Sequence, residues 1–321
     1  MKVIRGIAGV RKFKNPVVAL GVFDGVHLAH QHILKSTANI ARRIHGTAIV
    51  VTFWPHPQKQ ESLYSLKHRL FLISRLGIDA CIVINFSSEF ASLSAEDFIK
   101  KILVQKISAR YICVGDNFRF GRYAQGTVGL LKKFSKIYNY RLKVFDVIKI
   151  KSVPVSSTLI RRLILRGELR KAGRLLKKPV TVLGTVIKGD MLARGFGFPT
   201  ANINPHHEIL PPNGIYAVRV NSEGKNYKGI CYIGRRPTFL KKAQDTCRRV
   251  EVHIFNLKKD LYKKDLEIQF VSFIRKERRF DSKEDLIKQV KKDIFLVKTD
   301  FPSLRNTTTY DHYQAKIHYP L

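Results

Sequence analysis

The chain is 321 residues long and 45% hydrophobic, which favours two globular domains, and no apolar run reaches the ~18–20 residues that a membrane span requires. Its four cysteines (Cys81, Cys113, Cys231 and Cys247) form no CxxC pair and the N-terminus lacks the apolar core of a secretory signal, so we expect a cytoplasmic protein without disulfides, structural zinc or a membrane partner. A net charge of +35 suits an anionic partner such as nucleic acid, but the basic pairs are spread along the whole chain, which favours a lysine-rich solvated surface without excluding nucleic acid.

Short apolar runs alternate with helical patterns through the first half of the chain. The runs that predict buried strands are Val17–Phe23, Ala48–Phe53, Cys81–Phe86, Tyr111–Val114 and Leu142–Ile148. Between them, Ala29–His45 places apolar residues along one helical face, and Ser94-x-x-Asp97 resembles a capping box. This alternation predicts βαβ units and a mostly parallel, three-layer α/β sheet. We expect Ser157 or Thr158 to cap a last helix that Gly167 ends.

The rhythm changes after Lys178-Pro179. The second half has five strand patterns with little helical material between them: Val180–Ile187, Gly214–Val220, Tyr227–Ile233, Val250–Phe255 and Leu266–Phe273. Glycine and proline punctuate the gaps, which predicts a small antiparallel barrel, and one terminal helix follows Ser282. The expected domains are therefore residues 1–178 and 179–300, and residues 301–321 form a tail without an assignment.

The first candidate site follows the first predicted strand, where the sequence reads GVFDGVHLAHQHIL. Gly21 and Gly25 permit a sharp turn and a close approach of the backbone to a ligand. His27 and His30 share one face of a helix start, where free N–H groups and the helix dipole suit a triphosphate. The bland alternative is an ordinary glycine turn with solvated histidines.

Three further segments follow predicted strands: 52–57 (TFWPHP), 115–121 (GDNFRFG) and 155–161 (VSSTLIR). Open α/β sheets bind ligands beyond the carboxyl ends of their strands, so all of these segments are placed to meet the glycine turn. The polar candidates in them are Asn117, Ser157, Thr158 and Arg161, which offer an amide, hydroxyls and a guanidinium to phosphate or ribose. Their aromatic residues are equally consistent with core packing.

The motifs G-x-F-D-G-x-H-x-x-H, F-x-P-H-P, G-D-N-F-x-F-G and S-S-T-x-I-R, in this order, resemble the adenylyltransferase half of the prokaryotic bifunctional riboflavin kinase/FAD synthetases. The resemblance implies a Rossmann-like nucleotidyltransferase domain in which His27 and His30 bind and polarise the phosphates of ATP. It also implies a nucleotide pocket made of Gly21, Phe23, Asp24, Gly25, Asn117, Ser157, Thr158 and Arg161. The chain departs from the family at Ala29, where glycine is usual.

The second candidate site lies in residues 184–203, GTVIKGDMLARGFGFPTANI. Its glycines permit a flexible loop over phosphates, and Thr200 and Asn202 alternate, so that in an extended segment both oxygens face one side and could hold Mg²⁺. A glycine-rich surface loop that ends in an edge strand is the bland alternative.

This stretch resembles the flavokinase signature G-R-x-x-G-F-P-T-A-N, and GIYAVRV, IGRRPTF and VEVHIF follow it in family order. The resemblance implies that Thr200 and Asn202 contact the metal, that Gly189 and Arg194 contact the nucleotide, and that Glu251 is the general base. The chain departs from the family at Ala193 and at Cys231-Tyr232, where Ala-Asn is usual.

By this resemblance the barrel phosphorylates riboflavin to FMN with ATP, and the first domain joins FMN to a second ATP to form FAD and pyrophosphate, with Mg²⁺ in both steps. One alternative is a flavokinase whose first domain has an impaired or altered nucleotidyltransferase activity. The alternative from another class is a basic, flavin-responsive regulator that binds nucleic acid, although the chain has no groove-reading motif or basic arm.

Overall fold

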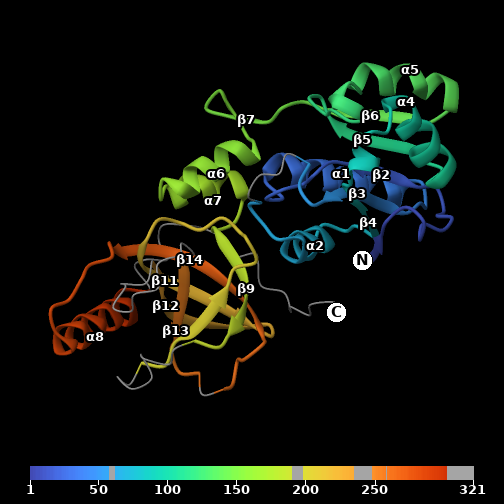
Figure 1. Cartoon of the computed structure of the whole chain (residues 1–321). Helices are drawn as coiled ribbons and strands as arrows, with labels where there is room; N and C mark the ends of the chain where they lie inside the picture. The colour runs from blue at the N-terminus through green and yellow to red at the C-terminus, as the bar shows by residue number, and fades with distance from the viewer. Residues whose placement is uncertain (58–61, 190–197, 235–247, 258, 302–321) are drawn as a thin grey trace. The chain divides into compact units, whose positions relative to one another are not determined.

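The computed structural model describes residues 1–57, 62–189, 198–234, 248–257 and 259–301 (Figure 1). The chain divides into two compact units, the first comprising Met1–Ser157 and the second beginning at Thr158. The division comes before the boundary expected at residue 178, so most of α6 (Ser157–Leu165) and all of α7 (Leu169–Leu176) fall into the second unit. No helix in the described ranges is both long and apolar enough to cross a membrane.

Parallel strands form the sheet of the first unit, in the order β1-β4-β3-β2-β5-β6 (blue to green in Figure 1). They are β1 (Lys2–Arg5), β2 (Val17–Leu20), β3 (Ala48–Trp54), β4 (Ala80–Asn85), β5 (Tyr111–Gly115) and β6 (Arg141–Phe145). The five expected strands are present with small shifts at their ends, and β1 is an additional edge strand. The order reverses between β2 and β5, and ligands bind at such a switch point in open α/β sheets.

Helix α1 (Leu28–Arg43) packs against β2, β3 and β5 with the apolar face that the sequence predicts. The other helical segments before residue 140 are α2 (Leu66–Ser74), α3 (Ser88–Ala91), α4 (Ala95–Asp97), η1 (Phe98–Lys106), η2 (Arg122–Ala124) and α5 (Val128–Tyr138). Ser94 caps α4 as expected, but the helix continues as the π-helical segment η1, which is wider than an α-helix.

The segment before the second unit differs from its expectation. A short hairpin, β7 (Lys149–Ile150) and β8 (Val153–Pro154), lies between β6 and α6. The expectation that Ser157 or Thr158 caps a last helix is wrong, because Ser157 is the first residue of α6 and its hydroxyl donates to the carbonyl oxygen of Asp24 at 2.8 Å. Gly167 follows α6 with a φ of +74°, as a helix end requires, but α7 then begins.

The second unit contains a closed antiparallel barrel in the order β10-β13-β12-β11-β14-β9 (Figure 1). Its strands are β9 (Thr181–Ile187), β10 (Ala201–Asn204), β11 (Gly214–Ser222), β12 (Lys225–Gly234), β13 (Arg249–Ile254) and β14 (Asp265–Arg275). The five expected strands are all present, and β10 closes the barrel between β13 and β9. Val250 and Val252 are buried in the barrel core, so Glu251 between them lies on the outer face.

Helix α8 (Lys283–Asp300) begins after the expected cap, Ser282, whose hydroxyl oxygen accepts a hydrogen bond from the N–H of Asp285. It contributes Ile294 and Val297 to an apolar cluster that also contains Ala217 of β11. Phe301, the first residue of the expected tail, is fully buried in the same cluster. The rest of the tail lies outside the described residues.

Candidate active sites

The β2–α1 loop (residues 21–27) turns sharply, as its glycines predict. Gly25 has a φ of +83°, in the left-handed region where a side chain is strained. A Cβ at Gly21 would lie 3.1 Å from the ring of Phe23, so a larger residue there would press on that ring. The loop ends at His27, which is the N-cap residue of α1. This region lies at the switch point of the sheet.

His27 and His30 lie together, as the sequence predicts, with stacked rings whose centroids are 3.6 Å apart. The Nδ1 atom of His27 accepts from the backbone N–H of His30 at 3.5 Å, which leaves the proton of the neutral ring on Nε2. Burial lowers the pKa of His27 to about 4. Burial, followed by the charges of His27 and Arg69, holds the pKa of His30 well below its ordinary value. Both rings are therefore neutral at pH 7.

His30 also has a buried polar atom that lacks a hydrogen-bond partner in the described part of the chain. This atom is Nδ1 of the imidazole ring. The ring of Phe23 packs edge-on against the His30 ring, with centroids 5.3 Å apart, and so supports it from the loop. A buried polar atom without a partner costs free energy unless a ligand or water satisfies it, which fits a role in binding.

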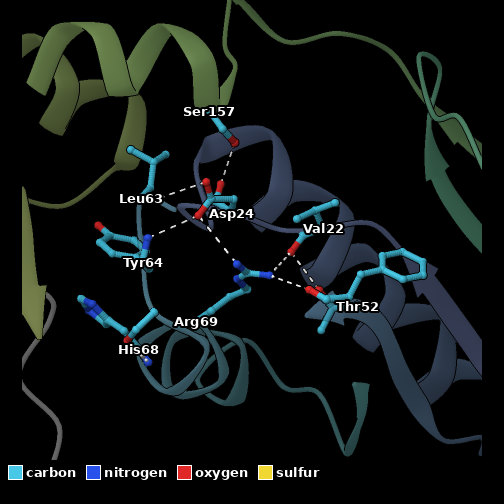
Figure 2. Close-up of polar contacts among 10 residues, drawn as sticks. Val22, Asp24, Thr52, Leu63, Tyr64, His68, Arg69 and Ser157 are labelled. Atoms are coloured by element: carbon cyan, nitrogen blue, oxygen red, sulfur yellow. Dashed lines mark hydrogen bonds and ion pairs between the residues drawn. The ribbon is translucent and has the colours of Figure 1, made fainter. Parts of the chain in front are cut away.

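Asp24, which the resemblance assigns to the nucleotide pocket, is buried. Its carboxylate faces the protein interior and accepts from the backbone N–H groups of Leu63 at 3.0 Å and Tyr64 at 3.3 Å (Figure 2). One oxygen lies 3.9 Å from Nη2 of Arg69, and the side chain is only 2% exposed. These contacts hold the β2–α1 loop against residues 63–69.

The remaining candidates of the first site occupy two places. Asn117 is exposed in the turn after β5, the strand that neighbours β2. Ser157 is joined directly to the β2–α1 loop through its hydrogen bond to Asp24 (Figure 2). Thr158 and Arg161 follow in the first turns of α6, where Thr158 is exposed and Arg161 is partly buried.

Arg69 lies in this region but belongs to none of the sequence motifs. It lies in α2, and its guanidinium donates to the carbonyl oxygen of Val22 (Figure 2). The guanidinium also donates to the carbonyl oxygen of Phe53. The only signal in the sequence is an arginine inside HRLFLIS, a stretch that is otherwise mostly apolar. An arginine that is buried in this way is rare unless it is paired.

The second site assembles on the outer face of the barrel. Asn202 of β10 stands directly opposite Glu251 of β13 in the strand register, so both side chains share one face. The hydroxyl of Thr200 lies 3.5 Å from a carboxylate oxygen of Glu251. A Cβ at Gly189 would lie 1.9 Å from the amide nitrogen of Asn202, so a larger residue there would displace the Asn202 side chain. Gly189, Thr200, Asn202 and Glu251 therefore meet.

These side chains fit a magnesium ion that is shared with phosphates. Mg²⁺ prefers oxygen ligands and is usually held by one or two protein groups together with substrate phosphates and water. Thr200 and Asn202 each offer a neutral oxygen, and Glu251 adds a nearby negative charge. No group of three or more His, Cys, Asp or Glu side chains forms a metal cage in the described ranges. Arg194 and Ala193 lie outside the described residues.

Tyr232 of β12 stands opposite Glu251 of β13 in the strand register, so Asn202, Glu251 and Tyr232 form a row across three neighbouring strands. Its hydroxyl donates a short hydrogen bond to the carboxylate of Glu277, which also accepts from the side-chain amide of Asn213 at 3.3 Å. Burial, and then the bond to Glu277, raises the pKa of Tyr232 above its ordinary value. The phenol therefore stays neutral and remains a donor.

Comparisons with known proteins cover both units. Residues 10–159 match the family model described as FAD synthetase, and residues 176–301 match the one described as riboflavin kinase. A bifunctional riboflavin kinase/FMN adenylyltransferase from Buchnera aphidicola subsp. Schizaphis graminum is 36% identical over 94% of this chain and 99% of its own length. The protein of the same description from Escherichia coli K12 is 32% identical over 91% of this chain and 96% of its own length.

A solved structure shows the same fold. The crystal structure of a macrolide-efflux protein from Streptococcus pneumoniae has a TM-score of 0.79 and 28% identity, and covers 93% of this chain and 99% of that chain. The two family models and the full-length relatives agree with one another. The chain belongs to the family of bifunctional riboflavin kinase/FMN adenylyltransferases.

Proposed function

We propose that this chain carries out both reactions of its family, phosphorylation of riboflavin in the barrel and adenylylation of FMN in the parallel-sheet domain. The observation that carries the proposal is the meeting of Gly189, Thr200, Asn202 and Glu251 on one outer face of the barrel. We assign residues 1–178 to the adenylyltransferase domain, because the start of α6 holds part of its motif set, and residues 179–300 to the kinase domain. A cytoplasmic location fits both reactions.

In the kinase reaction the carboxylate of Glu251 accepts the proton of the riboflavin 5′-hydroxyl. The hydroxyl oxygen then forms a bond to the γ-phosphorus of ATP, the bond from that phosphorus to the bridging oxygen breaks, and ADP leaves. Thr200 and Asn202 would hold Mg²⁺, which supplies charge neutralisation for the phosphates when bound. Gly189 leaves the space that Asn202 needs.

In the adenylyl transfer a phosphate oxygen of FMN forms a bond to the α-phosphorus of ATP, and pyrophosphate leaves. No protein nucleophile is needed, so positioning and charge stabilisation supply the catalysis. The Nε2–H of neutral His27 can donate to a phosphate oxygen, and the buried His30 lies against it. We assign phosphate binding to these histidines and to the N-terminus of α1, and further contacts with the nucleotide to Asn117, Thr158 and Arg161.

A product assay tests the proposal as a whole. The full chain is incubated with riboflavin, ATP and Mg²⁺, and FMN and FAD are separated by chromatography, with a parallel reaction in EDTA. We expect both products with Mg²⁺ and neither without it. FMN without FAD would support the flavokinase with an altered first domain. The absence of both products would contradict the proposal and favour the non-enzymatic alternative.

Glu251→Gln tests the proposed base in the barrel. The change keeps the shape of the side chain but removes its ability to accept a proton, so we expect FMN formation to fall about 10²–10⁴-fold. FAD formation from supplied FMN should be unchanged. Glu284→Gln, an exposed glutamate at the start of α8, is the matched control. A Glu251→Gln variant with normal FMN formation would show that Glu251 is not the base.

His30→Ala tests the first site. Loss of one donor to developing charge costs about 10²–10³-fold in rate, and we expect that loss in FAD formation alone. His32→Ala, in the same helix but exposed, should retain both activities. Equal loss of FMN and FAD formation in His30→Ala would point to a general defect in folding and against the assignment.

A further inference from the structure

Arg69 lies beneath the β2–α1 loop and has no exposed surface on its side chain. Its Nη1 atom donates to the carbonyl oxygen of Val22 at 2.8 Å and to that of Phe53 at 3.3 Å, while Nη2 lies 3.9 Å from the carboxylate of Asp24 (Figure 2). The guanidinium also lies over the ring of Trp54, 5.5 Å from its centroid. One side chain therefore contacts two separate segments of the site, the β2–α1 loop and the end of β3.

The segments that Arg69 joins are the ones that bear the candidate residues. Val22 belongs to the β2–α1 loop, and Phe53 and Trp54 end β3 beside the Pro-His-Pro sequence. Thr52 strengthens the same junction, because its hydroxyl donates to Val22 at 2.8 Å. The planar fork of a guanidinium can hold two carbonyl oxygens and a carboxylate at fixed angles, which an ammonium group cannot do.

The charge of Arg69 is also placed to act. A cation buried in the protein is screened weakly, so its field reaches further than that of a surface arginine. The groups whose charges act on the His30 ring are His27 and Arg69, and each disfavours a proton on that ring. The Asp24 carboxylate, 3.9 Å from the guanidinium, offsets part of this charge, and the remainder disfavours protonation of the buried His30.

We propose that Arg69 is a positioning residue of the adenylyltransfer site. Its fork fixes the β2–α1 loop, which carries the histidine pair into α1, to the end of β3. The proposal rests on the proposed function of this domain, and it adds a residue on α2 that belongs to none of the sequence motifs. The preferred ligand is the triphosphate group, because the contacts of Arg69 order the loop at the helix N-terminus.

The test uses the full chain with Arg69→Met, which removes fork and charge, and Arg69→Lys, which keeps the charge alone. FAD formation from supplied FMN is measured as kcat and KM for ATP. For Arg69→Met we expect kcat/KM to fall about 10²-fold, because a small displacement of the reacting groups costs about that much in rate. Riboflavin phosphorylation should be unchanged. Arg69→Lys should show a smaller fall in kcat/KM for FAD formation. Lys67→Met, an exposed lysine on the same helix, is the control for loss of a charge and should retain both activities.

A second readout follows the His30 ring by NMR across a pH titration. Burial lowers the pKa of His30 most, followed by the charges of His27 and Arg69, so Arg69→Met should raise that pKa in part, and Arg69→Lys should leave it near the wild-type value. The acid side of the pH profile of FAD formation should move to higher pH in Arg69→Met, because the ring gains its proton sooner as pH falls.

Two results would overturn the proposal. One is an Arg69→Met variant with wild-type FAD formation and an unchanged His30 titration. The other is a folded Arg69→Lys variant with wild-type kcat/KM while Arg69→Met fails to fold, which would make Arg69 a stability residue only. Failure of the proposed function itself is separate, because it would show as no FAD from the wild-type chain, and the His30 titration would still report the effect of Arg69.

Discussion

Tyr232 is the residue at which this chain departs from its family beside the proposed base. It stands in the row Asn202–Glu251–Tyr232 across three strands of the barrel, and its hydroxyl donates to Glu277 rather than to Glu251. The hydroxyl of Thr200 lies 3.5 Å from the carboxylate of Glu251. Where the family usually has the amide of an asparagine at the rim of the site, this chain has the phenol ring of Tyr232, which is hydrogen-bonded to Glu277.

We expect Tyr232→Phe to lower the free energy of unfolding of the barrel unit by about 1.5–3 kcal/mol, because a half-buried hydrogen bond to a carboxylate is lost. The rate of FMN formation should stay within a few-fold of wild type, since neither the metal contacts nor the base is changed. Urea unfolding followed by circular dichroism measures the first quantity and the product assay the second.

Tyr262→Phe is the matched control for Tyr232→Phe, because Tyr262 lies in the same unit and its hydroxyl makes no hydrogen bond within the described part of the chain. It should unfold like the wild type. If Tyr232→Phe were as stable as this control, the bond to Glu277 would contribute nothing. If it lost FMN formation altogether, the phenol would have a direct part in the reaction.

At the scale of elements, the sequence predicts helix starts best, because a serine cap and its partner lie within four residues of each other. Ser94 and Ser282 were both predicted as helix caps from a serine with an acidic residue three positions later, and both accept from that residue's backbone N–H. The Ser282 hydroxyl also donates to the Asp285 carboxylate. In the usual capping box a glutamate at this position accepts from the backbone N–H of the cap residue instead. Both capping predictions are confirmed.

The failed prediction at Ser157 has a tertiary cause. A serine at a helix start normally accepts from the helix backbone, but this hydroxyl donates to the carbonyl oxygen of Asp24, which lies far away in the sequence. No local pattern contains that partner. Helix α2 escaped prediction for a similar reason, because His68 and Arg69 are buried along with its apolar residues, so the helix shows no clear polar face.

The candidate sites show the same division between local and distant information. Alternation predicted that Thr200 and Asn202 share a face, but the pairing of Asn202 with Glu251 depends on strand register. The resemblance likewise assigns Asp24 to the nucleotide pocket, but no local pattern shows that its carboxylate lies among Leu63, Tyr64 and Arg69. Motifs predict which residues gather at a site, and only the folded chain shows which of them face outward.

At the scale of the whole molecule, the net charge of +35 calls for a test of nucleic-acid binding. Diffuse positive charge predicts weak binding that is independent of sequence and caused by the release of counterions from phosphates. For six to ten phosphate contacts, affinity falls by about 10³–10⁵-fold between 50 and 200 mM salt. We expect such a fall for two unrelated oligonucleotides, measured by fluorescence anisotropy at both salt concentrations.

Paired variants locate any binding surface. Lys132 and Lys133 are exposed on α5, and Lys291 and Lys292 are exposed on α8, so each pair can be changed to glutamine without touching either site. If the charge is diffuse, both double variants should weaken binding slightly and equally, because each removes two charges of many. A large loss in one variant alone would reveal a local footprint. Binding that persists at physiological salt with a sequence preference would favour the nucleic-acid regulator, since solvated surface charge cannot distinguish bases.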